Sequence, residues 1–207
     1  VLGDLFEYWA GDDDLDDPFN AKICAGLQRL SQSGVPLFFM AGNRDFLAGD
    51  GFASKAGLTL LPDPALVEIA GASVLLMHGD TLCTDDDAYQ MFRTEVRSPE
   101  WRKSFLALPL DQRKAKIEAL RQESEAQKRA KPAEIMDVNP AAVLQVLTSH
   151  RCTRLIHGHT HRPALHRLAV AGEACERWVL PDWYESGGYL ACDASGCRLL
   201  EWPPAAV

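Results

Sequence analysis

Five polar residues in this sequence are of the types that bind catalytic metal ions. They supply one carboxylate, one amide and three imidazoles, and they are Asp4, Asn43, His78, His159 and His161. A mixed set of oxygen and nitrogen ligands suits manganese, iron or zinc, and it differs from the cysteine-rich sets of structural zinc sites. Two ions roughly 3.5–4 Å apart can clamp a phosphoryl group and lower the pKa of a bridging water for in-line attack. The set predicts a metal-dependent phosphoester hydrolase, and a carboxylate such as that of Asp4 is able to bridge two ions.

The string HGHTH at residues 157–161 is the strongest single signal. Three histidines in five residues are improbable as packing, and residues two apart on an extended chain face the same side, so His159 and His161 can address one cluster. We expect His157 to be structural. Arg44, which follows Asn43, carries a permanently charged, planar guanidinium. It is suited to binding phosphate oxygens and to offsetting the negative charge that develops during hydrolysis.

Each candidate residue follows a short apolar run that predicts a strand. Such runs at residues 36–41, 73–77 and 153–156 end in GNRD, HGD and HGHTH, and residues 1–2 resemble the end of another strand. Ligands of open α/β sheets gather at the carboxyl ends of strands. Helices are predicted at residues 19–33 (after an Asp17-Pro18 cap), 115–131 and 140–149. Short β runs are predicted at residues 165–170, 177–180, 189–192 and 198–202.

The composition is that of a globular protein, with 47% hydrophobic and 24% charged residues and no apolar run near the roughly 20 residues of a membrane span. The net charge of −8 disfavours nonspecific nucleic-acid binding, which rests on a basic surface. Residues 88–131 differ from the rest, because they hold eleven Lys/Arg against six Asp/Glu. The six cysteines form no C-x-x-C pair, so we expect reduced thiols in a cytoplasmic protein.

Five longer strings resemble the calcineurin-like metallophosphoesterase superfamily and, within it, the UDP-2,3-diacylglucosamine pyrophosphohydrolase family. They are GDLFEYWAGDD (3–13), GNRDFL (42–47), MHGDTLCTDD (77–86), IMDVN (135–139) and IHGHTHRP (156–163). The resemblance implies an α/β fold of the metallophosphoesterase type, a β-sandwich flanked by helices, as a single domain over residues 1–207 with a helical cap inserted at 88–137. It implies hydrolysis of UDP-2,3-diacylglucosamine to UMP and 2,3-diacylglucosamine 1-phosphate in lipid A biosynthesis, by water attack on the phosphate nearest uridine.

The resemblance also implies residue roles. Two Mn²⁺ ions would be bound, with Asp4 bridging them, Asn43, His78 and His159 completing one site, and His161 belonging to the other. The expected catalytic residues are Asp4, Asn43, Arg44 and His78, and the expected substrate contacts are Asn43, Arg44, Asp86, Ser124, Lys131 and His159. The family opens with an Asp-x-His motif that this sequence does not contain. The resemblance therefore implies an N-terminally truncated domain in which the site of His161 lacks two ligands.

The expected partners are a nucleotide-sugar lipid as substrate and the cytoplasmic face of the inner membrane, reached by a monomer through its basic cap. The apolar residues of the cap either line a pocket for acyl chains or only pack helix on helix. They are Met91, Phe92, Trp101, Phe105, Leu106, Leu108, Leu110, Ile117 and Leu120. Two other functions stay open: a generic phosphodiesterase or nucleotide pyrophosphatase that uses the same metals, and a non-catalytic metal-binding module.

Overall fold

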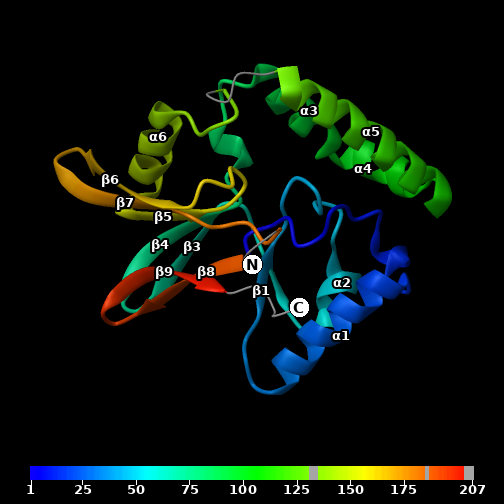
Figure 1. Cartoon of the computed structure of the whole chain (residues 1–207), viewed down its shortest axis with the longest axis horizontal. Coiled ribbons are helices and arrows are strands. Elements are labelled where there is room, and N and C mark those ends of the chain that lie inside the picture. The colour runs from blue at the N-terminus through cyan, green and yellow to red at the C-terminus, as the bar shows by residue number, and fades with distance from the viewer. Residues whose placement is uncertain (131–134, 185–186, 203–207) are drawn as a thin grey trace. The chain divides into compact units, whose positions relative to one another are not determined.

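The computed structural model describes residues 1–130, 135–184 and 187–202, and the side chains of all of these except 127–130. The chain divides into two compact units. The first unit comprises Val1, residues 3–62 and residues 86–136, and the second comprises Leu2, residues 63–85 and the chain from residue 137 onward. Figure 1 labels their helices and strands, and the predicted α/β class is confirmed. The predicted arrangement of one domain with an insertion at residues 88–137 stays a prediction.

The first unit is mainly helical. In chain order its elements are η1 (Asp12–Asp14), α1 (Pro18–Gln32), β1 (Phe38–Met40), α2 (Asp50–Ala56), β2 (Thr59–Leu61), α3 (Asp87–Val96), α4 (Pro99–Leu106) and α5 (Leu110–Ala130). The strands β1 and β2 pair in parallel. α1 begins where the sequence predicts, because the carboxylate of Asp17 accepts hydrogen bonds from the backbone N–H groups of residues 19 and 20 and Pro18 takes the first helical position.

An aromatic cluster forms the core of the first unit. The rings of Phe6, Trp9 and Phe52 are buried, and their centroids lie 4.6–5.5 Å apart. Phe105 of α4 belongs to the same core and stacks on Trp101 at a centroid distance of 4.5 Å. Apolar packing therefore holds α4 to this unit, in line with the packing role considered for these two residues.

A buried arginine joins α5 to the segment around η1. The side chain of Arg113 is only 2% exposed. Its Nε donates to the carbonyl of Leu108 at 3.0 Å, and its Nη1 donates to the carbonyl of Ala10 at 2.5 Å and to Oδ1 of Asp13 at 2.9 Å, while Nη2 pairs with Oδ2 of Asp13. Its neighbour Lys114 forms an ion pair with the buried carboxylate of Asp14 at 2.7 Å. Polar contacts thus attach the start of α5 to this segment, whereas apolar packing attaches α4.

The second unit is built on a five-stranded mixed sheet. Its elements are β3 (Ala65–Ile69), β4 (Ala72–Met77), η2 (Asp80–Leu82), α6 (Pro140–His150), β5 (Arg154–His157), β6 (Ala164–Val170), β7 (Glu173–Val179), β8 (Gly187–Asp193) and β9 (Gly196–Trp202). The sheet order is β3-β4-β5-β7-β6, with β4, β5 and β7 parallel and the two edge strands antiparallel to their neighbours. The predicted strands that end in HGD and HGHTH are β4 and β5, which lie side by side.

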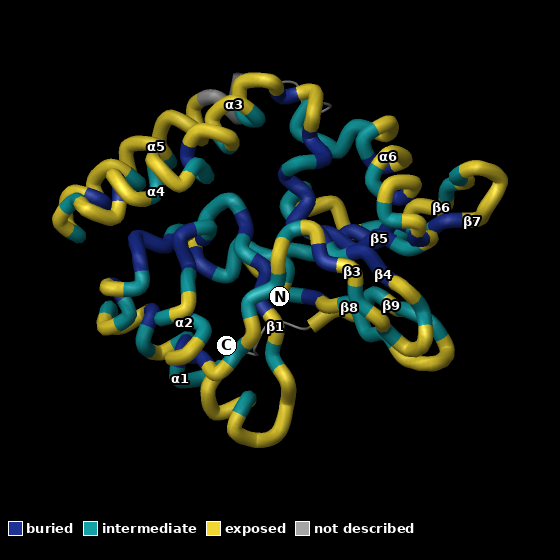
Figure 2. The backbone as a smooth tube through the Cα atoms, turned by 180° about the vertical axis from the view of Figure 1, so that it is seen from behind, coloured by how far each residue is buried: buried dark blue, intermediate teal, exposed yellow. Residues whose placement is uncertain are grey.

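Each face of this sheet is covered by a different element. Leu75 and Leu155 point from β4 and β5 into a core shared with Leu147 of α6. Val74 and Ile156, their neighbours along the two strands, point to the opposite face, where residues of the β8–β9 hairpin pack. Figure 2 shows both central strands in the buried colour. Successive residues of these strands thus point to opposite faces, and both faces are apolar, as expected for strands that are covered on two sides.

Asn139 begins α6 and closes a loop within the second unit. Its Oδ1 accepts hydrogen bonds from the first N–H groups of the helix, at 2.8 and 3.2 Å. Its backbone N–H donates to the carbonyl of Leu82 at 2.8 Å, and its Nδ2 donates to Asp85 Oδ1 at 2.8 Å. One residue therefore caps a helix and joins two segments that are 54 residues apart.

The expectation of reduced thiols is wrong for two of the six cysteines. Cys192 and Cys197, which face each other across the β8–β9 hairpin, form a disulfide, and the other four are buried and free. Among the described residues, no helix is long and apolar enough to cross a membrane.

Candidate active site

In the first unit, a buried carboxylate organises the segments that carry Asp4 and Arg44. Asp45 is fully buried, and its Oδ1 accepts hydrogen bonds from the backbone N–H of Gly42 at 2.7 Å and of Asp4 at 3.3 Å. Its Oδ2 accepts from the N–H of Leu5 at 2.7 Å. The turn after β1 is thereby tied to the segment that follows Gly3. In the sequence, Asp45 is only the last residue of GNRD, and nothing there predicts this role, because a turn-forming Asp is common on surfaces.

This scaffold places Asp4 against Arg44. The carboxylate of Asp4 accepts a hydrogen bond from the backbone N–H of Arg44 at 3.0 Å, and its Oδ2 lies 3.9 Å from Nε of the guanidinium. Arg44 is further fixed by its own carbonyl, which accepts from the N–H of Trp9 at 3.2 Å. Asn43 lies in the same turn and is half-buried. The structure therefore brings three predicted site residues, Asp4, Asn43 and Arg44, together within one unit.

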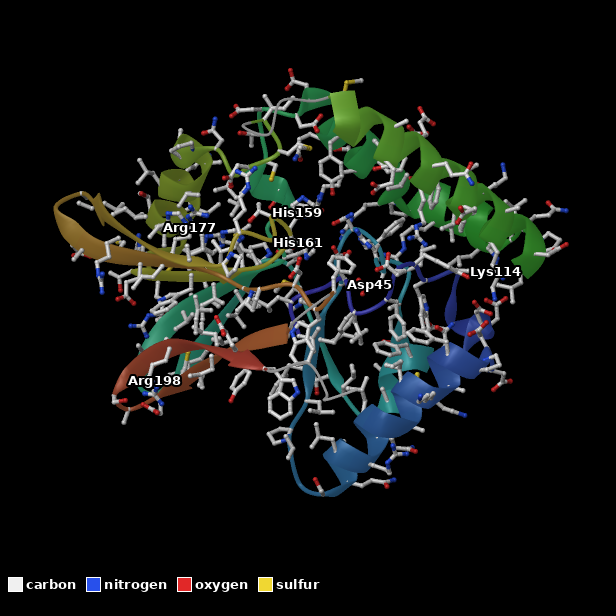
Figure 3. All side chains as sticks on the ribbon, viewed as in Figure 1. Asp45, Lys114, His159, His161, Arg177 and Arg198 are labelled. Atoms are coloured by element: carbon white, nitrogen blue, oxygen red, sulfur yellow. A yellow bond between two sulfur atoms is a disulfide. The ribbon has the colours of Figure 1, made fainter. Side chains whose placement is uncertain are left out.

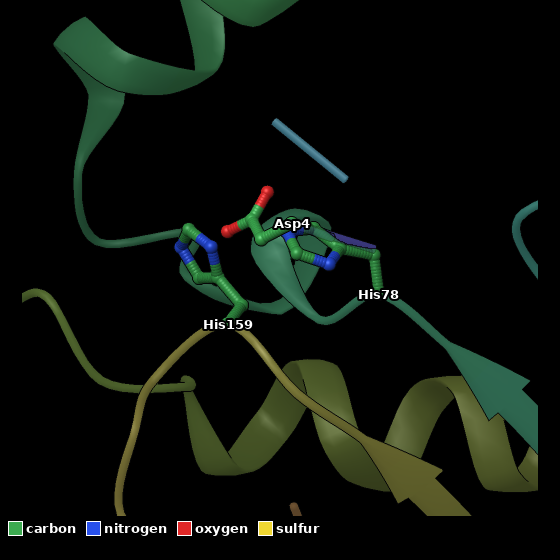
Figure 4. Close-up of side chains that lie close together, drawn as sticks. All are labelled: Asp4, His78 and His159. Atoms are coloured by element: carbon green, nitrogen blue, oxygen red, sulfur yellow. The ribbon is translucent and has the colours of Figure 1, made fainter. Parts of the chain in front are cut away.

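In the second unit, the ends of β4 and β5 bring two imidazoles together. His78 and His159 have ring centroids 5.0 Å apart at an interplanar angle of 69°. His78 is fully buried, and its Nδ1 donates to the carbonyl oxygen of Leu2 at 2.8 Å. Because that carbonyl only accepts, Nδ1 carries a proton, and Nε2 is the ring nitrogen that can serve as a metal ligand. Figure 4 shows both rings, drawn together with Asp4.

His157 is held as a structural residue, as expected from the sequence. It is buried, its Nδ1 faces the carbonyl of Gly158 at 2.9 Å, and its Nε2 receives a hydrogen bond from Nη1 of Arg177 at 3.0 Å. Burial lowers the pKa of His157 to about 4, so the ring is neutral at pH 7. Both ring nitrogens serve the protein, which leaves the other two histidines of HGHTH for ligands.

His161 is exposed, and an acidic neighbour orients its ring. Its Nδ1 lies 3.5 Å from Oδ2 of Asp182, and its ring centroid lies 5.7 Å from that of Tyr184. A carboxylate at Nδ1 is the usual partner of a histidine that binds a metal through Nε2. Figure 3 labels His159 and His161 at the end of β5. Sequence reasoning missed Asp182, because the sequence around it gives no sign of its pairing.

Three of the candidate ligands share an uncommon backbone conformation. Asp4, His159 and His161 have positive φ angles of 55°, 65° and 54°. Residues other than glycine seldom adopt this left-handed backbone conformation. Such strain persists where the surrounding structure enforces it, and it is common at functional sites. Between the two histidines, Thr160 has a buried Oγ1 that lacks a hydrogen-bond partner among the described residues. These features indicate that the loop after β5 is shaped for a ligand.

The other predicted substrate contacts are Asp86, Ser124 and Lys131. Asp86 is buried and caps α3 through a hydrogen bond from the N–H of Tyr89 at 3.1 Å. Ser124 is exposed on α5. Lys131 lies outside the described residues. The structure thus assigns Asp86 a capping role and leaves the three predicted substrate contacts as predictions.

The donor chemistry of the two groups fits a divalent metal. Carboxylate, amide oxygen and neutral imidazole are all ligands for manganese, iron or zinc, and the tautomer of His78 leaves Nε2 as the donor atom. A structural zinc site would instead use thiolates, and the four free cysteines are buried elsewhere in the two units.

Comparison with known proteins identifies the family. The sequence model of the calcineurin-like phosphoesterase family matches residues 1–163 of this chain. A UDP-2,3-diacylglucosamine hydrolase of Aromatoleum aromaticum is 52% identical over all of this chain and 82% of its own length. Enzymes of the same name from Enterobacter sp. and Aeromonas hydrophila are 47% and 49% identical over 98% and 96% of this chain, and over 84% and 82% of their own lengths.

A solved structure of Vps29 from Entamoeba histolytica, complexed with zinc, is also similar to this chain. The similarity covers 86% of this chain and 88% of the Vps29 chain, at 12% sequence identity and a TM-score of 0.32. The chain is a hydrolase of the calcineurin-like phosphoesterase family, and within it belongs with the UDP-2,3-diacylglucosamine hydrolases.

Proposed function

We propose that this protein hydrolyses the pyrophosphate bond of UDP-2,3-diacylglucosamine, releasing UMP and 2,3-diacylglucosamine 1-phosphate for lipid A biosynthesis. The observation that carries the proposal is 52% identity to a UDP-2,3-diacylglucosamine hydrolase over the whole chain. The paired imidazoles of His78 and His159 and the Asp4–Arg44 group support it, because phosphoester hydrolysis needs both metal ligands and a cation for phosphate oxygens.

We propose Mn²⁺ as the metal, with two ions per molecule. Asp4, Asn43, His78 and His159 would hold one ion, with Asp4 shared, and His161 would serve the other. Chain connectivity supports Asp4 as a partner of His78: Leu2, whose carbonyl accepts from His78, is two residues from Asp4, a span of at most about 7 Å. When bound, the ions would polarise phosphoryl oxygens and lower the pKa of the attacking water.

Residues of the chain would bind and orient the substrate. The guanidinium of Arg44 would bind phosphate oxygens of the pyrophosphate and offset the negative charge that develops as the bond breaks. Asp45 holds the turn on which Asn43 and Arg44 lie, so their side chains need little reordering when substrate binds. Asp86, Ser124 and Lys131 are proposed as further contacts to the substrate.

The lipid half of the substrate would meet α3–α5. Met91, Phe92, Leu106 and Leu120 expose 75%, 41%, 40% and 37% of their surface, whereas Trp101, Phe105, Leu108 and Ile117 pack into the core of the first unit. The exposed set would contact acyl chains, and the basic residues of the same segment would meet anionic head groups. We therefore propose a monomer bound peripherally to the cytoplasmic face of the inner membrane.

The test is Mn²⁺-dependent release of UMP from UDP-2,3-diacylglucosamine by the protein. Asn43→Ala and His159→Ala should each reduce release by at least about a hundredfold, since each removes a proposed metal ligand. His166→Ala, a histidine on β6, is the matched control and should retain activity.

Two outcomes would favour the other functions. Faster turnover of a soluble diester, such as bis(p-nitrophenyl) phosphate, than of the lipid substrate would indicate a generic phosphodiesterase. Metal binding without release of any product would indicate a binding module. Full activity in His159→Ala would contradict the assignment of the metal ligands.

A further inference from the structure

One carboxylate oxygen in the first unit receives hydrogen bonds from two arginines. Oε2 of Glu7 pairs with Nη1 of Arg44 and accepts from Nη2 of Arg121 at 2.9 Å. The three residues come from the segment after Asp4, from the turn after β1 and from α5. Glu7 therefore links the proposed phosphate-binding arginine to the helix α5.

Glu7 complements the contacts that already fix the rest of Arg44. The backbone of Arg44 is bonded to Asp4 and Trp9, and its Nε lies 3.9 Å from Asp4 Oδ2. Glu7 engages the far end of the same guanidinium, at Nη1. Two acidic groups on different edges of a planar cation determine the orientation of its plane. The side chain of Arg44 is 21% exposed and that of Glu7 50% exposed, so the pair is partly solvated and salt will weaken it.

Charge gives Glu7 a second effect on Arg44. Two guanidinium groups that meet at one oxygen atom repel each other, and the carboxylate between them offsets that repulsion. Arg121 is itself held, because its Cζ lies 5.9 Å from the ring centroid of Tyr8. Without the carboxylate, the repulsion between the two guanidinium groups would disfavour this orientation of Arg44.

We propose that Glu7 is a positioning residue, which holds the guanidinium of Arg44 in the orientation that meets the substrate's pyrophosphate. The inference rests on the proposed function, in which Arg44 contacts phosphate oxygens. Glu7 acts through Arg44 and does not itself touch substrate, because a carboxylate and a pyrophosphate repel each other.

A double-mutant cycle tests this role. Glu7→Gln keeps an acceptor of similar shape and removes the charge, so kcat/KM for UMP release should fall by roughly five- to tenfold. In an Arg44→Gln background the same change should alter kcat/KM by less than about twofold, because the residue through which Glu7 acts is absent. Glu68→Gln, an exposed glutamate of β3, is the matched control and should leave kcat/KM unchanged.

A second readout needs no turnover. The dissociation constant for inorganic pyrophosphate, measured by calorimetry, should rise by a similar factor in Glu7→Gln and stay within twofold between Arg44→Gln and the double variant. Equal losses in both backgrounds would show a merely structural role, and no loss in the wild-type background would show no role at all; either result overturns the proposal. A wild-type protein that binds pyrophosphate but releases no UMP would count against the proposed function alone.

Discussion

Replacing Arg113 by methionine should destabilise the first unit by about 2–5 kcal/mol. The change leaves the fully buried carbonyl of Ala10 without its donor, at a cost of roughly 1–3 kcal/mol, and removes the hydrogen bond to Leu108, worth about 1 kcal/mol. The partner carboxylate of Asp13 is 60% exposed and can be solvated, so its lost ion pair adds less than about 1 kcal/mol. Methionine retains most of the buried apolar stem, so little cavity forms.

Urea unfolding followed by tryptophan fluorescence measures this loss, since Trp9 lies in the core of the same unit. Lys116→Met, at an exposed position of α5, is the matched control and should change the free energy of unfolding by less than about 0.5 kcal/mol. An Arg113→Met protein as stable as that control would refute the assignment of Arg113 as a buried anchor of α5.

The ion pair also predicts how the difference depends on pH. Hydrogen bonding to Arg113 holds the pKa of Asp13 below its ordinary value of about 4. A carboxylate with a depressed pKa in the folded state stabilises the protein above its unfolded pKa, and this contribution is lost as the pH falls through the folded pKa. The stability difference between wild type and Arg113→Met should thus be constant near neutral pH and shrink below about pH 4. An undiminished difference at pH 3 would contradict the role of the carboxylate.

Two further changes test the second unit. Gly79→Ala should lower its thermal stability, because φ is +118° and the added Cβ would lie 2.8 Å from Nδ1 of His157; Gly172→Ala, with φ +86° but no atom within 4 Å, should lower it less. Equal shifts in melting temperature would show that the contact does not matter. Asp182→Asn should weaken Mn²⁺ binding by about tenfold or more, because Asp182 orients His161 through Nδ1. If calorimetry shows an unchanged affinity for Mn²⁺, Asp182 has no role in orienting a metal ligand.

Local signals explain which parts of the fold could be predicted. The cap at Asp17 and the strands that end in HGD and HGHTH were predicted within a few residues, because capping chemistry and apolar runs are encoded locally. Helix α2 (Asp50–Ala56) and strand β3 (Ala65–Ile69) were missed. The helix has only seven residues and no side-chain cap, and the strand alternates exposed and partly buried positions at the edge of its sheet.

Partners distant in sequence explain what could not be predicted. The parallel pairing of β4 with β5 joins residues about 80 positions apart, and no local period encodes that register. The same holds for the site: Asp4, Arg44 and His78 were recognisable as types that do chemistry, whereas Glu7 and Asp45 resemble ordinary acidic residues until their hydrogen bonds are seen. Residue type predicted the ligands, and only the structure shows what orients them.

The hydrogen bonds of Asn139 bear on how this family can vary. Since Asn139 is bonded to Leu82 and Asp85, the residues on either side of segment 86–136 are fastened together within the second unit. A segment whose two ends are pinned at one point can gain or lose residues at a small entropic cost, about 0.6 kcal/mol for a doubling of length. The segment that carries α3–α5 can therefore differ in length between members of the family without a change in the register of β4 and β5.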